Sequence, residues 1–164
     1  MTENLREQYA TDDNLRARIA LHSAFSINPH WAEWLFDREA PAAETVRRVV
    51  LCTGKFGHEL IERRNKENAP VAVIRLEQLY PFPGAEVRAA LEAYPGAALV
   101  WAQEEPENMG AWFFVQSHLS RLLGPDLAIT PVAREESGSP ASGSQTVHDR
   151  EQDELLAAAI SEPI

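Results

Sequence analysis

Apolar residues follow two different periods along residues 48–160, and their alternation predicts a repeated unit of strand and helix. Short continuous apolar runs, typical of strands buried on both faces, occupy residues 48–53, 71–76, 98–103 and 127–133. Apolar residues recur at helical spacing over residues 58–65, 85–94, 111–123 and 148–160. Strands that alternate with helices indicate a mainly parallel sheet with helices on both faces, which is a three-layer α/β/α fold.

Glycine and proline mark the expected connections between these elements. Gly54-Lys-Phe-Gly57 is expected to form the turn that follows the first strand. Tyr80-Pro-Phe-Pro-Gly84 should end the second strand, because prolines cannot sit in a central ladder. Pro106 likewise predicts that the third strand ends at Gln103 and that a loop continues to Gly110.

The amino-terminal part of the chain has a different character. Residues 1–40 are polar and helix-prone, with Trp31, Trp34 and Phe36 largely on one helical face. Residues 40–44 have the composition of a linker. The expected organisation is therefore a helical appendage and linker over residues 1–44, followed by one α/β domain over residues 45–164.

Composition narrows the classes of function. A chain of 164 residues with 45% hydrophobic residues can bury the core of one domain. Its net charge of -10 opposes nucleic-acid and anionic-membrane partners. No apolar run approaches the roughly 20 residues of a bilayer-spanning helix, and the first residues lack a signal-peptide core, so a cytoplasmic location is expected. Cys52, the single cysteine, is expected to be a buried, inert strand residue.

Acidic and amide side chains gather where the third strand is expected to end and the next helix to begin. In an open α/β sheet, ligands and partners usually dock at this carboxyl edge. The segment is therefore a candidate interface, with a helix-entry loop of solvated acids as the alternative. Its residues are Gln103, Glu104, Glu105, Pro106, Asn108, Gly110 and Trp112.

A second candidate site lies at the ends of the first two predicted strands. Thr53, Lys55 and Arg75 fall there, and a pair of cations is suited to a phosphorylated effector. The alternative is that both cations pair with acids such as Glu77 or Glu104. Gly54-Lys55 is not a phosphate loop, because the motif's leading glycine and its hydroxyl residue are absent.

Other chemistry-bearing residues lack the companions that catalysis or metal binding needs. His58 and His148 have no second His or Cys at ligand spacing, which favours solvent-exposed histidines at helix ends. Ser139 and Ser142 lie in a flexible loop without the Gly-x-Ser-x-Gly elbow. No catalytic residue and no metal ligand is therefore assigned.

Three separated motifs resemble the carboxy-terminal domain of the thiamine-dependent decarboxylase component of 2-oxoglutarate dehydrogenase. They are Ile74-Arg-Leu-Glu-Gln-Leu-Tyr-Pro-Phe-Pro83, Trp101-Ala-Gln-Glu-Glu-Pro-Glu-Asn-Met-Gly-Ala-Trp112 and Ser137-Gly-Ser-Pro-Ala-Ser-Gly143, followed by His148 and Glu151-Gln152. The resemblance covers about residues 47–161. It implies a domain like the carboxy-terminal domain of transketolase.

The resemblance also implies a role and a set of partners. In the parent enzyme the domain packs in the dimer, so its expected partners are the remaining decarboxylase domains, a homodimer partner and the dihydrolipoyl succinyltransferase component. The parent enzyme uses thiamine diphosphate and Mg²⁺, held by a Gly-Asp-Gly motif that this sequence lacks. The chain is therefore expected to bind no cofactor and to assist assembly or regulation. In one bacterial branch of the family, acetyl coenzyme A acts through this domain.

Two alternatives remain open. Asn14-Leu-Arg-Ala-Arg-Ile-Ala and Trp34-Leu-Phe-Asp37 resemble the lead-in of class I S-adenosylmethionine methyltransferases. The next strand, however, ends in Gly54-Lys-Phe-Gly57 without the acidic, glycine-rich loop that such a cofactor site needs. The change of resemblance near Ala42 also fits a chimeric or truncated reading frame whose product has no independent role.

Overall fold

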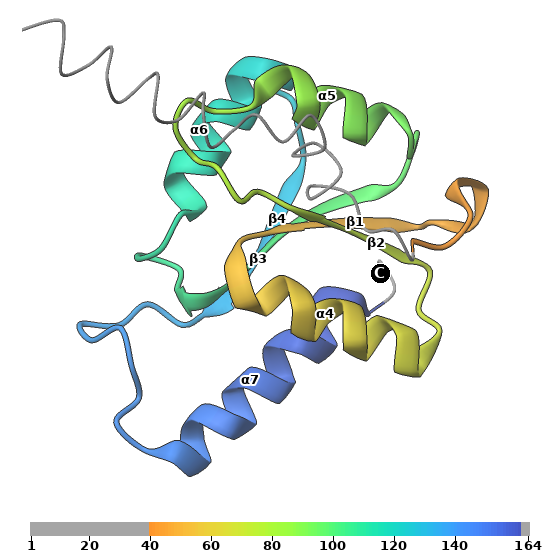
Figure 1. Ribbon diagram of the computed structural model, residues 1–164. Helices are drawn as coiled ribbons and strands as arrows, with labels where there is room; N and C mark the ends of the chain where they lie inside the picture. Colours follow the sequence, from red (N-terminus) through yellow and green to blue (C-terminus); the bar gives the residue numbers. More distant parts are fainter. Residues whose placement is uncertain (1–39, 162–164) are drawn as a thin grey trace, which may run out of the picture. The chain divides into compact units, whose positions relative to one another are not determined.

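A computed structural model of the chain describes residues 40–161, and four strands within this range form a single parallel sheet (Figure 1). The sheet order is β2-β1-β3-β4. The strands are β1 (Arg48–Cys52), β2 (Val71–Arg75), β3 (Ala98–Pro106) and β4 (Ile129–Arg134). The helices are α4 (Gly54–Glu67), α5 (Gly84–Glu92), α6 (Trp112–Leu123) and α7 (Gln145–Ile160), preceded by the 3₁₀ turn η1 (Ala43–Thr45). The predicted α/β fold is confirmed.

The amino-terminal expectations fall on residues that the structure does not describe. The helical appendage and the aromatic face of Trp31, Trp34 and Phe36 lie within residues 1–39, outside the described residues, as do residues 162–164. The boundary expected at residue 44 therefore stays a prediction.

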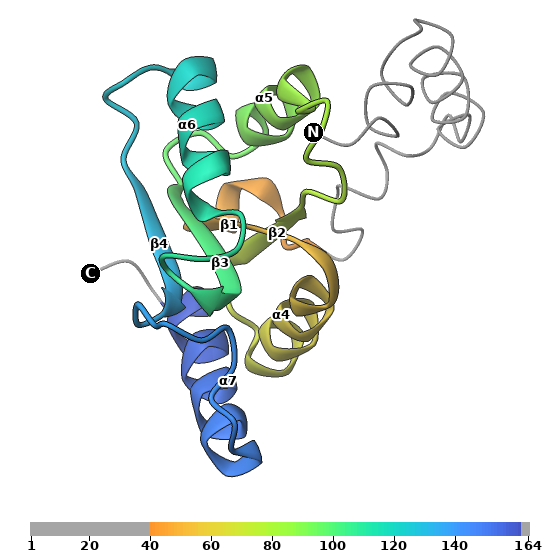
Figure 2. The ribbon, with the colours of Figure 1, turned by 90° about the vertical axis from the view of Figure 1, so that its left-hand side faces the viewer.

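The sheet is covered on both faces, as the continuous apolar strands require. Figure 2 shows α4 and α7 on one face and α5 and α6 on the other. Alternate residues of each strand serve the two layers, so Val50 joins the core beneath α4 and α7, whereas Leu51 points to the opposite side. Both side chains are fully buried.

The strands start together, so their carboxyl ends meet at one edge. Arg48 of β1 pairs with Val71 of β2 and with Ala98 of β3, and Leu99 pairs with Ile129 of β4. The residues that follow the strands therefore face one another across this edge. Both predicted sites contain residues of this kind.

Two of the predicted boundaries that differ from the structure concern glycine or proline. The expected turn at Gly54-Lys-Phe-Gly57 is instead the first turn of α4, with Gly54 at φ 58°. Gly57 lets the Arg75 side chain cross the helix, because a Cβ atom there would clash with it. β3 continues past Gln103 to Pro106, which pairs with Arg134 after a register shift. Such an irregularity admits a proline to a strand.

Arg48 ties the first strand to the last helix. Its Nη1 atom donates to the carbonyl oxygens of Ala158 at 2.8 Å and Ala159 at 3.2 Å. These carbonyls belong to the last turn of α7, where the negative end of the helix dipole also attracts the Arg48 guanidinium. The two ends of the described domain are thus joined by a charged side chain as well as by the apolar core.

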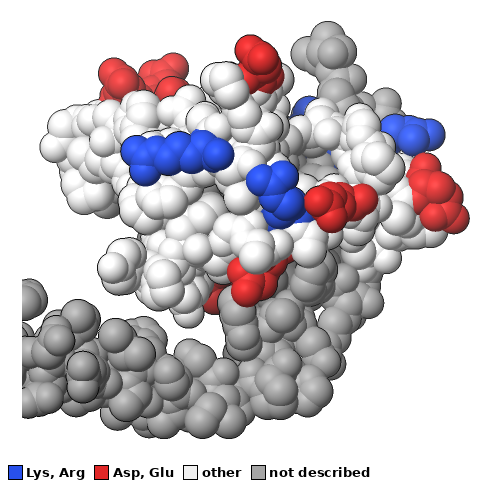
Figure 3. All heavy atoms as spheres, turned by 90° about the horizontal axis from the view of Figure 1, so that it is seen from above, with Lys and Arg blue, Asp and Glu red and all other residues white. Residues whose placement is uncertain are grey.

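Charged residues of both signs are interspersed on the face seen from above in Figure 3, most of which is uncharged. On that face Lys and Arg form no continuous patch. Two aromatic side chains of α6 are notably accessible, with Phe113 55% and Phe114 39% exposed. Within residues 40–161, no helix is both long and apolar enough to cross a bilayer.

Candidate functional site

The carboxyl edge of the sheet brings together residues from β1, β3, β4, α4 and α7, and the predicted interface segment lies at its centre. This segment is not a simple loop, because Gln103, Glu104, Glu105 and Pro106 belong to β3. Only Glu107 to Ala111 connect the strand to α6. The segment therefore starts from a strand that the sheet holds in place.

Gln103 organises the connection from inside. Its side chain is 2% exposed, and its Oε1 atom accepts hydrogen bonds from Trp101 Nε1 at 2.9 Å and from the Trp112 backbone at 3.0 Å. Its Nε2 atom donates to the carbonyl oxygens of Pro106 at 3.0 Å and Met109 at 2.8 Å. One buried amide thus satisfies groups on both sides of the turn, as buried polar groups require.

The predicted interface residues divide into an internal and an external group. Gln103, Pro106 and Trp112 are buried within the described chain, so they shape the segment. Glu105, Asn108 and Gly110 are exposed and accessible to a partner. Asn108 also exchanges two hydrogen bonds with the backbone of Ser137, through Nδ2 at 3.0 Å and Oδ1 at 3.1 Å. This pair anchors the serine loop, which we define as residues 135–144.

Glu104 belongs to a polar cluster that links three elements. Gln152 of α7 donates from Nε2 to Glu104 Oε1 at 2.8 Å and to Glu59 Oε2 at 2.7 Å. Lys55 Nζ lies 2.5 Å from Glu59 Oε1 and 3.4 Å from Glu104 Oε1. Two carboxylates on different elements therefore share one amide donor and one cation.

The cluster shifts the ionisation of its members. Burial raises the pKa of Glu59, but the hydrogen bonds from Lys55 and Gln152 outweigh burial, so the net pKa lies below its ordinary value. The hydrogen bond to Glu59 raises the pKa of Lys55. Both groups are therefore held in their charged forms at neutral pH.

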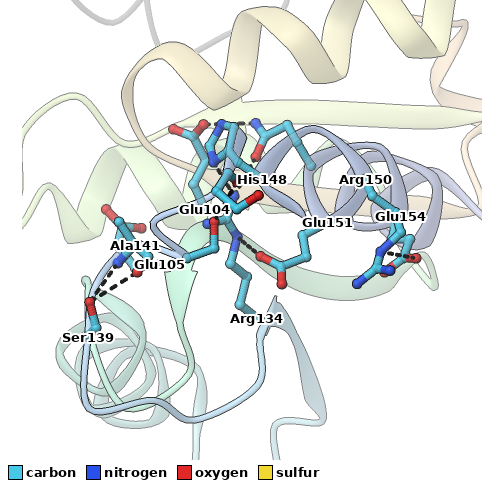
Figure 4. A network of polar contacts seen from close by, with 12 residues as sticks. Glu104, Glu105, Arg134, Ser139, Ala141, His148, Arg150, Glu151 and Glu154 are labelled. Atoms are coloured by element: carbon cyan, nitrogen blue, oxygen red, sulfur yellow. Dashed lines mark hydrogen bonds and ion pairs between the residues drawn. The ribbon is translucent and has the colours of Figure 1, made fainter. Parts of the chain in front are cut away.

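Arg134, at the end of β4, continues the network toward α7 (Figure 4). Its Nη2 atom lies 2.9 Å from His148 Nδ1 and 3.4 Å from Gln152 Oε1, and its Nε atom lies 3.4 Å from Glu151 Oε2. His148 is half-buried against this guanidinium, so the expectation of a solvated histidine there was wrong. Sequence reasoning marked His148, Glu151 and Gln152 as part of a motif and missed Arg134.

The predicted effector residues have partners of their own. Lys55 contacts Glu59 and Glu104, as described above, while Arg75 lies 3.4 Å from Glu77 Oε1 and also contacts His58. The alternative in which both cations pair with acids therefore describes the structure. Thr53 is the N-cap residue of α4, and its side chain makes no capping hydrogen bond. Its hydroxyl and the 66%-exposed Lys55 side chain both stand at the start of this helix.

The described residues of this domain offer neither a metal-binding cluster nor an ionised thiol. Among residues 40–161, no group of three or more His, Cys, Asp or Glu side chains could hold a metal ion. Burial raises the pKa of the Cys52 thiol to about 12, so the thiol is protonated at neutral pH, as expected for an inert strand residue. Paired charges and amides remain as the functional groups of the carboxyl edge.

The sequence matches a known family along most of its length. The sequence model described as 2-oxoglutarate dehydrogenase C-terminal matches residues 22–160. A 2-oxoglutarate dehydrogenase E1 component of Cupriavidus necator is 42% identical over 134 residues, which are 80% of this chain and 14% of that protein. A mitochondrial 2-oxoglutarate dehydrogenase of Caenorhabditis elegans is 44% identical over 122 residues, 72% of this chain and 12% of that protein.

A further relative, an E1 component of Rickettsia felis, is 44% identical over 119 residues, 70% of this chain and 12% of that protein. The chain therefore spans about an eighth of the length of these relatives.

The comparisons extend the resemblance and remove one alternative. The family match begins at residue 22, upstream of the expected start near residue 47, so it includes Trp34-Leu-Phe-Asp37. The methyltransferase alternative, which rested on residues 1–40, finds no support in these relatives. With the family model matching most of the chain and several relatives near 40% identity, the chain belongs to the 2-oxoglutarate dehydrogenase C-terminal family.

Proposed function

We propose that this chain acts as the carboxy-terminal assembly and regulatory domain of a 2-oxoglutarate dehydrogenase E1 component and is not catalytic alone. The family match over residues 22–160 carries this proposal. The Cupriavidus necator E1 component is roughly seven times longer than the matched segment, since 14% of that protein is covered. Most of such an enzyme therefore lies outside this domain.

The residues present do not fit the cofactor of the parent enzyme. Thiamine diphosphate is held through Mg²⁺, which takes oxygen ligands and bridges them to the diphosphate. The sequence contains no Gly-Asp-Gly motif, and residues 40–161 contain no cluster of potential metal ligands. The proposed role is accordingly contact with other parts of the enzyme, without a chemical step.

The proposed partners are the remaining decarboxylase domains, a homodimer partner and the dihydrolipoyl succinyltransferase component. The accessible part of the interface segment, Glu105, Asn108 and Gly110, is the contact we assign to the assembled E1 component. Hydrogen bonds from Gln103 to the segment's backbone, and from Asn108 to Ser137 of the serine loop, fix the conformation of this part. It therefore loses little conformational entropy when it binds a partner.

A domain exchange tests the proposal. In the Cupriavidus necator E1 component, the region that matches this chain is replaced by residues 22–160. We expect the exchanged protein to remain a dimer in sedimentation and to oxidise 2-oxoglutarate with an artificial electron acceptor when thiamine diphosphate and Mg²⁺ are present. A folded dimer that binds the cofactor with no activity would overturn the assembly role, as would a folded monomer.

The isolated chain provides the complementary measurement. Calorimetric titration with thiamine diphosphate and Mg²⁺ should show no saturable heat, and 2-oxoglutarate should not be consumed. Saturable binding at micromolar cofactor would contradict the non-catalytic role. The alternative of a chimeric or truncated reading frame is tested by the neighbouring coding sequence, where an upstream frame with Gly-Asp-Gly would support the assembly role.

The start of α4 is a second functional candidate, as an effector site. Thr53 supplies an uncapped hydroxyl and Lys55 an exposed ammonium group beside the backbone N–H groups of the first helical turn, a combination suited to a phosphate. Arg75, the further cation expected from the sequence, is already engaged by Glu77 and His58, so Thr53 and Lys55 carry this candidate. The effector proposed here is a phosphorylated ligand, and acetyl coenzyme A, which acts through this domain in one branch of the resembled family, serves as its probe.

A further inference from the structure

A groove lies beside the outer strand of the sheet, on the side away from the effector candidate. Its volume is about 700 Å³, within the range of protein ligand sites. The four consecutive residues Pro131 to Arg134 of β4 line one side, and the serine loop lines another. The flank of α7 that carries Arg150, Glu154 and Ala158 completes the groove. Figure 4 shows this region, with Ser139 and Ala141 in the loop and Arg150 and Glu154 on the helix.

The backbone of β4 is open toward the groove. β4 is an edge strand that pairs with β3 alone among the strands of the described chain, and Figure 2 shows it at the margin of the sheet. An edge strand presents backbone N–H and C=O groups that an additional strand can pair with. Val132 and Ala133 are only half-buried, so apolar surface accompanies these groups.

The side chains around the groove give it a negative charge. Four glutamates, Glu135, Glu136, Glu151 and Glu154, line it together with two arginines, Arg134 and Arg150. Each arginine already contacts one of these acids, Arg134 with Glu151 and Arg150 with Glu154. Glu135 and Glu136 are exposed and make no ion pair within residues 40–161. Two uncompensated carboxylates therefore stand at the end of an open strand edge.

We propose that this groove binds an extended peptide with basic side chains, as an added strand on β4. Main-chain groups of the peptide pair with the outer edge of β4, while its Lys or Arg side chains meet Glu135 and Glu136. The four β4 residues that line the groove match about four residues of an added strand, at about 3.3 Å per residue.

The charge of the groove selects against other ligands. A carboxylate, a phosphate or a nucleic acid would meet two unpaired glutamates, and the chain as a whole carries a net charge of -10. A neutral peptide would gain the backbone pairing without the ionic contacts. The proposal is independent of the assembly role above, because it rests only on the geometry and charge of the groove.

The probe is a fluorescein-labelled heptapeptide of alternating Lys and Val, titrated with the full 164-residue chain at low salt. Fluorescence anisotropy should show saturable binding. The double variant E135Q/E136Q should bind about tenfold more weakly, which corresponds to ~1.4 kcal/mol. The matched control E86Q/E92Q removes two acidic charges from α5, which does not line the groove, and should change the affinity less than about twofold. Circular dichroism melting confirms that each variant is folded.

Two further probes separate backbone pairing from simple charge attraction. A heptapeptide with Glu in place of Lys should not bind, and a Lys-Val peptide with alternate N-methylated amides should lose most of its affinity. Amide resonances of Val132, Ala133 and Arg134 should shift on binding, whereas those of β2, the opposite edge strand, should not. Equal affinity for the N-methylated peptide, or shifts confined to β2, would overturn the proposal.

Self-association is measured in the same samples. The chain should sediment identically with and without the peptide, apart from the mass of the peptide. If the chain formed a dimer that the peptide failed to dissociate, and the amides of β4 were protected in that dimer, the groove would hold a second copy and the proposal would be overturned.

Discussion

The backbone of Gly110 and the side-chain amide of Gln103 lie in direct contact. A Cβ atom on Gly110 would come within 2.9 Å of Gln103 Oε1 and 3.0 Å of its Cδ atom. Gln103 in turn fixes the backbone on both sides of the connection between β3 and α6. The conformation of the interface segment therefore depends on a position where any side chain larger than hydrogen disturbs a buried amide.

Replacement of Gly110 by alanine should lower the free energy of unfolding by roughly 2–4 kcal/mol, as the sum of backbone strain and a forced shift of Gln103. Gly143 provides the matched control, because its φ of +70° is close to the +66° of Gly110 and a Cβ atom on it would meet no other atom within 4 Å. Gly143→Ala should cost only about 1 kcal/mol. Urea titration measures the free energy of unfolding of both variants. Equal losses in the two variants would show that the contact with Gln103 contributes nothing to stability.

Glu59 predicts a specific pH dependence of stability. Its pKa in the folded chain lies below the ordinary value of 4.5, so its contribution is present above that value and is lost as the pH falls through the folded pKa. Glu59→Gln should therefore be less stable than the native sequence at pH 7, and the difference should disappear at acidic pH. Urea titrations of both proteins from pH 7 to pH 3 measure this. A difference that grows on acidification would contradict the assignment.

Glu104 and Glu105 should respond differently to neutralisation. Glu105 is exposed, so Glu105→Gln should leave the stability of the isolated chain unchanged within ~0.5 kcal/mol. Glu104 accepts from Gln152 and contacts Lys55, so Glu104→Gln should cost about 1 kcal/mol. In a complete E1 component, Glu105→Gln should weaken the dimer or the coupling to the succinyltransferase while sparing cofactor affinity. Sedimentation and whole-complex turnover test this, and unchanged values would rule out the contact.

The effector candidate is tested with acetyl coenzyme A as the probe. Calorimetric titration of the chain should show saturable binding, and Lys55→Ala should weaken it about tenfold because a charge-assisted contact to phosphate is removed. Lys66→Ala, a matched change in the last turn of the same helix, should leave binding unchanged. If Lys55→Ala bound acetyl coenzyme A as tightly as Lys66→Ala does, Lys55 would not belong to the site.

The order of strands and helices could be predicted from the sequence because each element carries its own period. The continuous apolar runs at Val49-Val-Leu-Cys52 and Val71-Ala-Val-Ile74 are strands in the structure, and the helical face with Leu155 and Ile160 packs in the core. Predictions from local sequence failed where contacts between distant residues determine the conformation. Gly57 was predicted to lie in a turn, but it belongs to α4. The Arg75 side chain packs against it where a Cβ atom would clash.

The polar cluster at the carboxyl edge could be predicted only in part. The position of Glu104 after an apolar strand placed it correctly at the edge. Gln152 lies 93 residues from Glu59 and 48 from Glu104 along the chain, and nothing in local spacing signals their contact. Gln103 was predicted to face a partner, although its amide is committed to backbone groups of its own segment. A single sequence shows the type of each side chain but not its distant partners.

The contact of Arg48 with the end of α7 has a consequence for how the chain folds during its synthesis. The residue that starts the first strand is translated more than a hundred positions before its carbonyl partners, Ala158 and Ala159. The core beneath α4 is also incomplete without Leu155, Ala159 and Ile160 of α7, which belong to the same buried cluster as Val50 and Val73. On the ribosome, the part of this face that α7 covers therefore stays exposed until α7 emerges from the exit tunnel, and closure of this core is a late event.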